Sequence, residues 1–530
     1  MLHTAKIERI QGAPALTVDG RPIPMMAYQW RLGIAIDSDP GHDSRWQIEN
    51  MARAGVELFF TEIQLDDPAR FEELYSVFMS EMELLTEIVP DALVIPWIRV
   101  NPYADFARKY PGDVIRFDNG STGEWTELFN TGLPSLDTPR FTYASEAWKR
   151  EVGGLLLTFI RRLYAGPYAE TIIGYFFFLL DQECSYFFEY DVRKRCIDFS
   201  PAMCSAFRDH LIEKYQGDEQ LLRSAWDDES VTFSSVQIPD LAERTTGDFG
   251  YFRDPGKSQK CLDYAECHNE TASDKLEYFG KICKEESDDR AVVGAFWGYL
   301  QNQDIQMGGH ARFKKLLDSP YVDIWSSPFT YENRFCGNFA SMRMAIQTLN
   351  CHNKLFFAEV DTFLSDTRVS DLKVHNYPDQ SKSDDEAVLK RDFVYPFCEG
   401  ANGWWIDWCS GVSQYRKDGL RPLMRKLREI GEEGFKRPRG NVSDVAAAID
   451  QESLLIPACN SYNHFDGSDT IHSVRLMRHN LDRFRVHELC RLGTPVDFYE
   501  TDDILEGREY RLYIFMNQYA ASSHERRLID

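Results

Sequence analysis

The sequence predicts an α/β protein: a (β/α)8 TIM barrel over residues 1–435, a linker at 436–440 and a smaller flavodoxin-like α/β domain over 441–530. Eight short apolar segments alternate with segments of helical periodicity, which is the pattern of a parallel barrel. The run Lys436-Arg437-Pro438-Arg439-Gly440 then interrupts this pattern as a linker does. Strand-like segments begin again beyond it.

The predicted barrel strands are apolar runs rich in β-branched and aromatic residues, bounded by polar or turn-forming residues. The first continues from a hairpin within residues 14–34, whose turn is Asp19-Gly20. The other seven strands are expected at 55–63, 92–101, 172–183, 291–299, 322–327, 353–362 and 403–408.

Helices are expected between these strands wherever apolar residues recur three and four positions apart. Ser200 and Pro201 form an N-cap followed by Pro at the first helical position, opening a helix that ends near Gln216-Gly217. The other barrel helices are expected at 46–54, 70–88, 144–164, 258–286, 311–317, 340–349, 385–397 and 420–430.

The second domain is predicted to contain a parallel sheet. Strands are expected at 444–450, 496–499 and 512–516, with a helix at 473–492. Because a further helix begins shortly before Asp530, we expect this domain to be incomplete, as in a truncated fragment.

Composition limits the possible partners. The net charge of −25 argues against nucleic acid and anionic membrane surfaces, which need a positive footprint. No apolar run is long enough to span a bilayer, and the first residues lack a signal-peptide core, so a cytoplasmic location is expected. The 12 cysteines contain no CxxC pair and are expected to be reduced thiols.

Motifs for several other functions are missing from the sequence. It contains no G-x-G-x-x-G, H-E-x-x-H or G-x-S-x-G. The segment from Gly250 to Ser258 has five residues between its glycines, where a phosphate-binding loop needs four. We therefore expect no cofactor and no metal.

Two glutamates end predicted strands in the same way. Glu359 lies at the end of the seventh strand, and Glu183 at the end of the fourth. Parallel barrels place their chemistry at such strand ends, so we expect the two carboxyl groups to face each other. Asp181, Glu189 and Asp191 lie nearby and are alternative candidates for the carboxyl group assigned to Glu183.

A pair of carboxyl groups is what glycosidic bond cleavage requires. One protonates the leaving oxygen, while the other attacks the anomeric carbon or activates water. Their surroundings must hold one protonated and the other ionised near neutral pH. A separation of about 5–5.5 Å gives retention of configuration, and a wider one gives inversion.

An acid/base after strand four and a nucleophile after strand seven resemble the clan A glycoside hydrolases. The chain is similar to family 42 β-galactosidases in particular. The similar segments are Asp198-Phe199-Ser200-Pro201-Ala202, Phe207-Arg208, 211–215, Ala225-Trp226, 326–331 and the run around Trp405. The sequence departs from the clan at Gln182, where an Asn that contacts the sugar is usual before the acid/base.

The resemblance implies a retaining, exo-acting β-galactosidase with Glu183 as acid/base and Glu359 as nucleophile. It also implies that the region after Val445 is an amidotransferase-like domain that helps to form trimers, so a homo-oligomer is expected.

Further substrate-binding residues are expected at other strand ends. Arg99 and Asn101 end the third strand. Arg99 either keeps the nucleophile ionised or orients a hydroxyl group of the substrate, or it forms a structural ion pair. Tyr28 and Asp407 are weaker candidates. With Gln182, the expected set is completed by a stacking platform of Trp297, Tyr331 and Trp405.

Two functions from other classes are alternatives to a glycosidase. An inactive barrel could bind carbohydrate as a scaffold. A lyase or metal-dependent hydrolase would need histidines and aspartates clustered at the strand ends, where the sequence places acids and aromatics. Among glycosidases, β-glucosides, β-mannosides, α-arabinosides and modified oligosaccharides remain possible substrates.

Overall fold

A computed structural model describes most of the chain. The described residues are 2–24, 26–29, 44–65, 67–102, 105–122, 141–179, 196–250, 252–298, 308–330, 334–362, 364–365, 381–406, 415, 419–458, 481 and 488–530.

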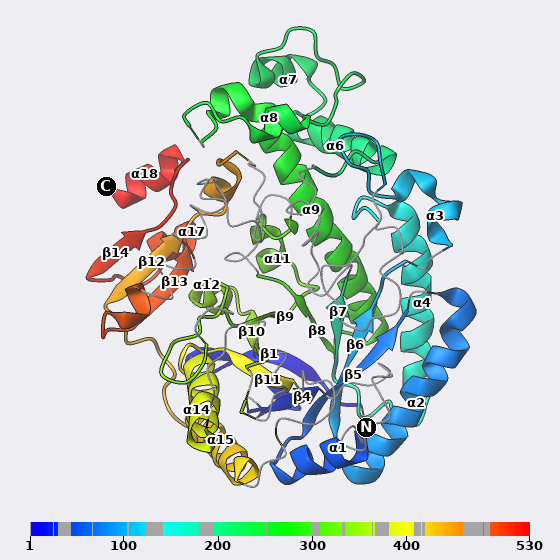
Figure 1. The fold of residues 1–530 in the computed structure, drawn as a ribbon, viewed down its shortest axis with the longest axis vertical. Helices are drawn as coiled ribbons and strands as arrows, with labels where there is room; N and C mark the ends of the chain where they lie inside the picture. Colours follow the sequence, from blue (N-terminus) through cyan, green and yellow to red (C-terminus); the bar gives the residue numbers. More distant parts are fainter. Residues whose placement is uncertain are drawn as a thin grey trace.

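A closed barrel of parallel strands forms the centre of the molecule (Figure 1). Neighbouring strands follow one another in the chain, and the last pairs with the first. The strands are β4 (Ala27–Gln29), β5 (Leu58–Gln64), β6 (Leu93–Arg99), β7 (Gly174–Phe178), β8 (Val292–Phe296), β9 (Ile324–Pro328), β10 (Leu355–Val360) and β11 (Asn402–Ile406). The prediction of a (β/α)8 barrel is confirmed, with all eight strands near their expected positions.

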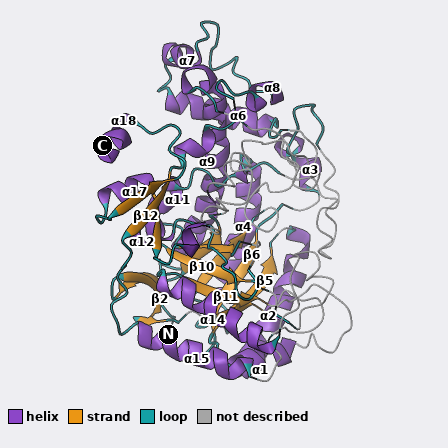
Figure 2. Ribbon diagram, turned by 60° about the vertical axis from the view of Figure 1, so that its left-hand side comes forward, coloured by secondary structure: helices purple, strands orange, loops and turns teal. Residues whose placement is uncertain are grey.

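Helices surround the barrel (Figure 2). They are α1 (Ser44–Arg53), α2 (Phe71–Ile88), α3 (Phe106–Lys109), α4 (Glu146–Tyr164), α9 (Pro255–Glu286), α11 (Lys314–Asp318), α12 (Ile346–Cys351), α14 (Lys382–Cys398) and α15 (Leu420–Gly434). Short 3-10 helices lie at η2 (Pro68–Arg70) and η3 (Pro111–Asp113). Each helix expected around the barrel is present, although α11 and α12 are shorter than predicted.

A small antiparallel sheet precedes the barrel. It contains β1 (Ala5–Ile10), β2 (Ala13–Val18) and β3 (Arg21–Pro22). The predicted turn at Asp19-Gly20 joins β2 to β3, with φ of 51° and 78° at its two residues. A second turn, Gln11-Gly12, joins β1 to β2 and was not predicted. Positive φ at both turn residues suits the twist of a two-residue hairpin.

The long connection after β7 forms a helical layer from α6 (Pro201–Lys214), α7 (Glu219–Trp226) and α8 (Leu241–Thr245). Ser200 caps α6 as predicted, because its Oγ accepts a hydrogen bond from the Met203 N–H at 3.2 Å. These helices pack on the first half of α9 through residues such as Phe207 and Tyr264. Since α9 leads back to the start of β8, this layer lies toward the carboxyl ends of the strands.

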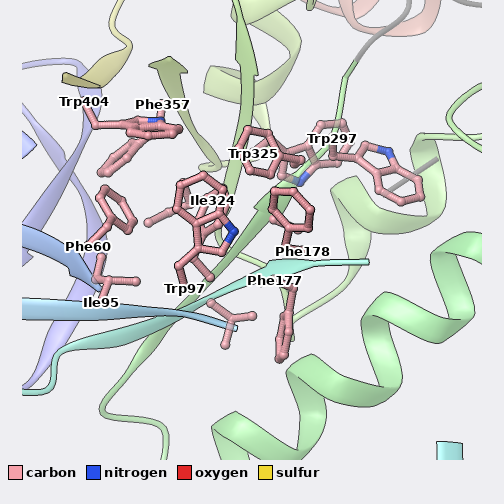
Figure 3. Close-up of a cluster of buried hydrophobic side chains, with 14 of the residues drawn as sticks. Phe60, Ile95, Trp97, Phe177, Phe178, Trp297, Ile324, Trp325, Phe357 and Trp404 are labelled. Carbon is pink, nitrogen blue, oxygen red and sulfur yellow. The ribbon is translucent and has the colours of Figure 1, made fainter. Parts of the chain in front are cut away.

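Aromatic side chains fill the barrel interior (Figure 3). The rings of Trp97 and Trp404 lie 5.3 Å apart, edge to face, although their strands are not neighbours in the sheet. A Cβ at Gly294 would come within 2.7 Å of the Phe176 ring, so the glycine makes room for it. The interior layer consists of Phe60, Trp97, Phe176, Phe178, Phe296 and Trp404.

The smaller α/β domain contains the predicted parallel sheet, and its strand order is β13-β12-β14. Its elements are β12 (Val445–Ile449), η4 (Glu452–Leu455), η6 (Leu489–Arg491), β13 (Val496–Glu500), α17 (Thr501–Glu506), β14 (Leu512–Phe515) and α18 (Ser523–Ile529). Most of the helix expected at 473–492 lies outside the described residues. The sheet packs beside the barrel helix α12 (Figure 2). In the described ranges, no helix has the length and apolar character to cross a bilayer.

Candidate active site

Glu359 lies near the carboxyl end of β10, on the interior face of the barrel. It is paired in register with Trp404 on one side and Pro328 on the other. Paired residues of parallel strands point to the same face, and Trp404 contacts the rings of Phe60 and Trp97 across the interior. The side chain is only 5% exposed. A strand end inside a rigid barrel therefore holds this carboxyl group, as the sequence predicts.

Hydrogen bonds fix the strands on both sides of Glu359. Trp404 Nε1 donates to Ser326 Oγ at 3.1 Å, and Ser326 Oγ–H donates to the Phe357 carbonyl at 2.6 Å. Three successive strands, β9, β10 and β11, are thereby connected through side chains as well as through their ladder bonds. The backbone that carries Glu359 is preorganised, which is a condition for accurate placement of a reacting group.

An ion pair joins β5 and β6 near their carboxyl ends. Arg99 Nε donates to Glu62, and the Arg99 guanidinium lies 3.8 Å from the centre of the Phe178 ring. Both charged side chains are 14% exposed. Of the two roles expected for Arg99, the ion pair is the one the structure shows, and its partner Glu62 was not predicted.

Arg334 holds the first residue after β10, Asp361, and we call this pair the clamp. Arg334 forms a buried ion pair with Asp361 and donates from Nη2 to the Asp361 carbonyl at 3.0 Å. Arg391 of α14 in turn donates to the Arg334 carbonyl at 2.6 Å. These contacts hold the chain at the point where it leaves the strand, two residues beyond Glu359.

Trp297 and Trp405 are buried in aromatic contacts. The Trp297 ring stacks on His310 with 4.2 Å between ring centres, directly after β8. Trp405 is paired with Tyr28, and both contact Tyr415, so Trp405 lies on the outer face of β11. Trp404 is the tryptophan of this strand on the side of Glu359. A stacking role for Trp405 stays a prediction that this placement does not favour.

Other predicted site residues differ in how far the structure describes them. Asn101 lies two residues beyond β6 and is half-buried. Gln182, Glu183, Tyr331 and Asp407 lie outside the described residues. The structure thus brings Glu359 and Arg99 to one end of the barrel, and the assignment of Glu183 stays a prediction.

Gln29 is an interior residue that the sequence analysis did not single out. It is the last residue of β4 and is paired with Phe60 and Ile406. The side chain is 2% exposed, and its Oε1 has no hydrogen-bond partner in the part of the chain that the structure describes. An apolar run ending in Gln at a strand end was the available signal in the sequence.

Comparison with known proteins identifies solved glycosidases that share this fold. No protein-family model and no curated protein matches the sequence. Among solved structures, the β-galactosidase of the psychrophilic Marinomonas ef1 matches with a TM-score of 0.59 and 12% identity, over 95% of this chain and 73% of that one. The chain has the fold of family 42 β-galactosidases.

Two further structures extend this likeness. A catalytic mutant of a family 42 β-galactosidase from G. stearothermophilus has a TM-score of 0.58 and 13% identity, over 96% of this chain and 69% of that one. A family 42 exo-carrageenase from Bacteroides ovatus has a TM-score of 0.55 and 12% identity, over 100% of this chain and 66% of that one. At these identities the likeness concerns the fold.

Proposed function

We propose that the protein is a retaining, exo-acting glycoside hydrolase that cleaves β-galactosides. The observation that carries the proposal is the buried carboxyl group of Glu359, near the carboxyl end of β10 and on the interior face of the barrel. The three solved structures reported above share this fold and are named as glycosidases, which supports the same class of reaction.

In the proposed mechanism, the Glu359 carboxylate attacks the anomeric carbon and the bond to the leaving oxygen breaks. Glu183 donates its proton to that oxygen, then removes a proton from the water that hydrolyses the glycosyl–enzyme ester. Two inversions at the anomeric carbon give net retention. The mechanism requires the two carboxyl groups to lie about 5–5.5 Å apart.

Residues around Glu359 would position the nucleophile and line the site. The clamp formed by Arg334 and Asp361 would fix the end of β10, and Trp404 would present an apolar face beside the nucleophile. The pair of Arg99 and Glu62 would form a charged part of the rim. Binding contacts from Asn101, Gln182, Trp297 and Tyr331 remain part of the proposal, whereas the placement of Trp405 on the outer face of β11 does not favour a contact with the sugar.

The first experiment measures turnover of a panel of aryl glycosides by the wild type, Glu359→Ala and Glu183→Ala. We expect an aryl β-galactoside to be cleaved, and Glu359→Ala to reduce kcat by a factor of about 10⁴ or more, because the covalent step is lost. Glu433→Ala serves as the control, since Glu433 is an exposed residue of α15 paired with Lys436. Wild-type turnover by Glu359→Ala would refute the assigned nucleophile.

The panel also separates the alternative substrates. It includes β-glucosides, β-mannosides, α-arabinosides and carrageenan oligosaccharides, the last because of the likeness to the exo-carrageenase fold. Cleavage of one of these instead of the β-galactoside would retain the mechanism and replace the substrate. Binding without turnover of any sugar would favour the inactive scaffold.

A further inference from the structure

The amide group of Gln29 is buried at the end of β4. Its oxygen, Oε1, accepts no hydrogen bond from any residue that the structure describes. The side chain is 2% exposed, and Oε1 has no partner among the described residues. A buried polar group without a partner destabilises the folded state, and such groups need an explanation. An apolar residue of the same length would avoid this cost, so folding alone does not account for Gln at this position.

The register places this amide on the interior face. Gln29 is paired with Phe60, whose ring contacts Phe176 and Trp404 across the barrel. The preceding residue, Tyr28, has its ring 6.3 Å from that of Tyr415 and lies on the outer face with Trp405. Since successive side chains of a strand alternate between faces, Gln29 points inward.

Gln29 also belongs to the same rim as Glu359. The strands β10, β11 and β4 are consecutive in the barrel, and neighbouring strands lie about 4.8 Å apart. The strands of Glu359 and Gln29 are therefore separated by roughly 10 Å. Both side chains point into the barrel interior.

The polar neighbours on the rim satisfy one another, in contrast to Gln29. On the two strands that follow β4, Glu62 accepts a hydrogen bond from Arg99. The amide of Gln29 is neutral, so it can bind a hydroxyl group without holding a counter-ion. This chemistry suits a neutral sugar better than a charged ligand.

We propose that Gln29 binds a hydroxyl group of the sugar ring that Glu359 attacks, with Oε1 accepting the hydrogen bond. The inference rests on the proposed glycosidase function and adds a specificity-determining residue to it. The hydroxyl group would supply the partner that Oε1 lacks among the residues that the structure describes.

The test compares Gln29→Met with Gln347→Met. Gln347 is a matched control, because it is also buried and both ends of its amide are bonded: Oε1 accepts from the Phe498 N–H at 2.8 Å, and Nε2 donates to Glu399 at 2.6 Å. We expect Gln29→Met to leave Tm unchanged or to raise it, whereas Gln347→Met lowers Tm because it breaks two hydrogen bonds.

The second readout uses deoxy sugars. For the substrate that the wild type cleaves best, we expect Gln29→Met to reduce kcat/KM by about 10- to 100-fold, and Gln29→Asn to do so less. With the monodeoxy substrate that lacks the contacted hydroxyl group, the wild type and Gln29→Met should have the same kcat/KM. Gln347→Met should discriminate between the substrates as the wild type does.

The outcomes separate this inference from the proposed function. If Gln29→Met lowers Tm as Gln347→Met does and keeps the wild-type response to every deoxy substrate, the amide is structural and the inference is wrong. If the wild type cleaves no glycoside, calorimetric titration with galactose replaces kinetics, and weaker binding by Gln29→Met would still support the contact. Equal binding by both proteins, or binding by neither, would overturn it.

Discussion

At the scale of single residues, the ion pair of Arg99 and Glu62 is the best-defined charged contact on the rim. The two side chains are largely withdrawn from solvent, and the guanidinium also lies over the Phe178 ring. Removing one partner of such a pair leaves an uncompensated charge, which costs more than the pair itself contributes. The stability of the barrel mouth should therefore depend on both members together.

A double-mutant cycle tests this dependence. We expect Arg99→Met to lower the free energy of unfolding by about 2–3 kcal/mol, because Glu62 then lacks its partner in a partly buried place. Combining it with Glu62→Met should cost less than the sum of the two single changes. Urea unfolding of the four proteins gives the coupling energy, and simple additivity would show that the pair is not an energetic unit.

The residue scale also shows what the sequence could reveal about the site. An apolar run that ends in an acid predicted the place of Glu359, since strand ends of parallel barrels share one rim. It could not distinguish Trp404 from Trp405, because a shift of one residue exchanges the two faces of a strand. Gln29 was missed because a lacking hydrogen bond is a property of three-dimensional packing.

At the scale of secondary-structure elements, Glu81 is an ionisable group buried between α2 and the barrel. Thr61 Oγ1 of β5 donates to its carboxyl group at 3.2 Å. Burial raises the pKa of Glu81 to about 8, and the nearby charge of Glu62 adds to this effect. In the folded protein the neutral form is favoured, so the contact of α2 with β5 depends on pH.

The sign of this dependence follows from the raised pKa. The stabilising contribution of neutral Glu81 is complete below its ordinary pKa of 4.5 and is lost as pH rises through about 8. We expect Glu81→Gln, which stays neutral, to be more stable than the wild type at pH 9 by about 1–2 kcal/mol and similar to it at pH 4.5. Urea unfolding between pH 4.5 and 9 measures the free energy of unfolding of both proteins. The same pH dependence in both would contradict the raised pKa of Glu81.

Elements with a strong local signal were predictable, and those defined by tertiary contacts were less so. The cap formed by Ser200 and Pro201 fixed the start of α6 within the sequence itself. In contrast, β7 ends at Phe178, before the end of the apolar run that suggested it. Pairing with neighbouring strands sets where a strand ends, and one strand read alone does not contain that information.

At the scale of the whole molecule, the smaller domain is bound to the barrel through α12. Thr348 Oγ1 accepts a hydrogen bond from the Glu500 N–H at 2.7 Å. The His352 ring lies between Asp503 of α17 at 3.1 Å and Asp318 of α11 at 3.2 Å. The hydrogen bond to Asp503 raises the pKa of His352 above 6.5, and burial raises the pKa of Glu500 to about 8.

Both shifts have the same consequence for the interface. His352 stabilises it as a cation below pH 6.5 and loses this effect as pH rises through its raised pKa. Neutral Glu500 stabilises it below pH 4.5, and this contribution is lost through about 8. Between pH 6 and 9, we expect protection of β13 amides against hydrogen exchange to fall relative to β5, once intrinsic rates are corrected.

The variant His352→Gln provides the control for this interface. It removes one of the two titrating groups, so the decrease in protection of β13 with pH should become smaller, while β5 should be unaffected. Equal pH dependence of β13 in the wild type and the variant would show that His352 does not contribute to the docking.

The product that Glu359→Ala forms with azide shows whether Glu359 is the nucleophile. If Glu359 is the nucleophile of a retaining β-galactosidase, azide occupies the space left by the carboxylate and attacks the same face of the sugar. We expect restored release of the aryl group from an aryl β-galactoside, with α-galactosyl azide as the product. Full activity of Glu359→Ala without azide, or an azide product of β configuration, would contradict it.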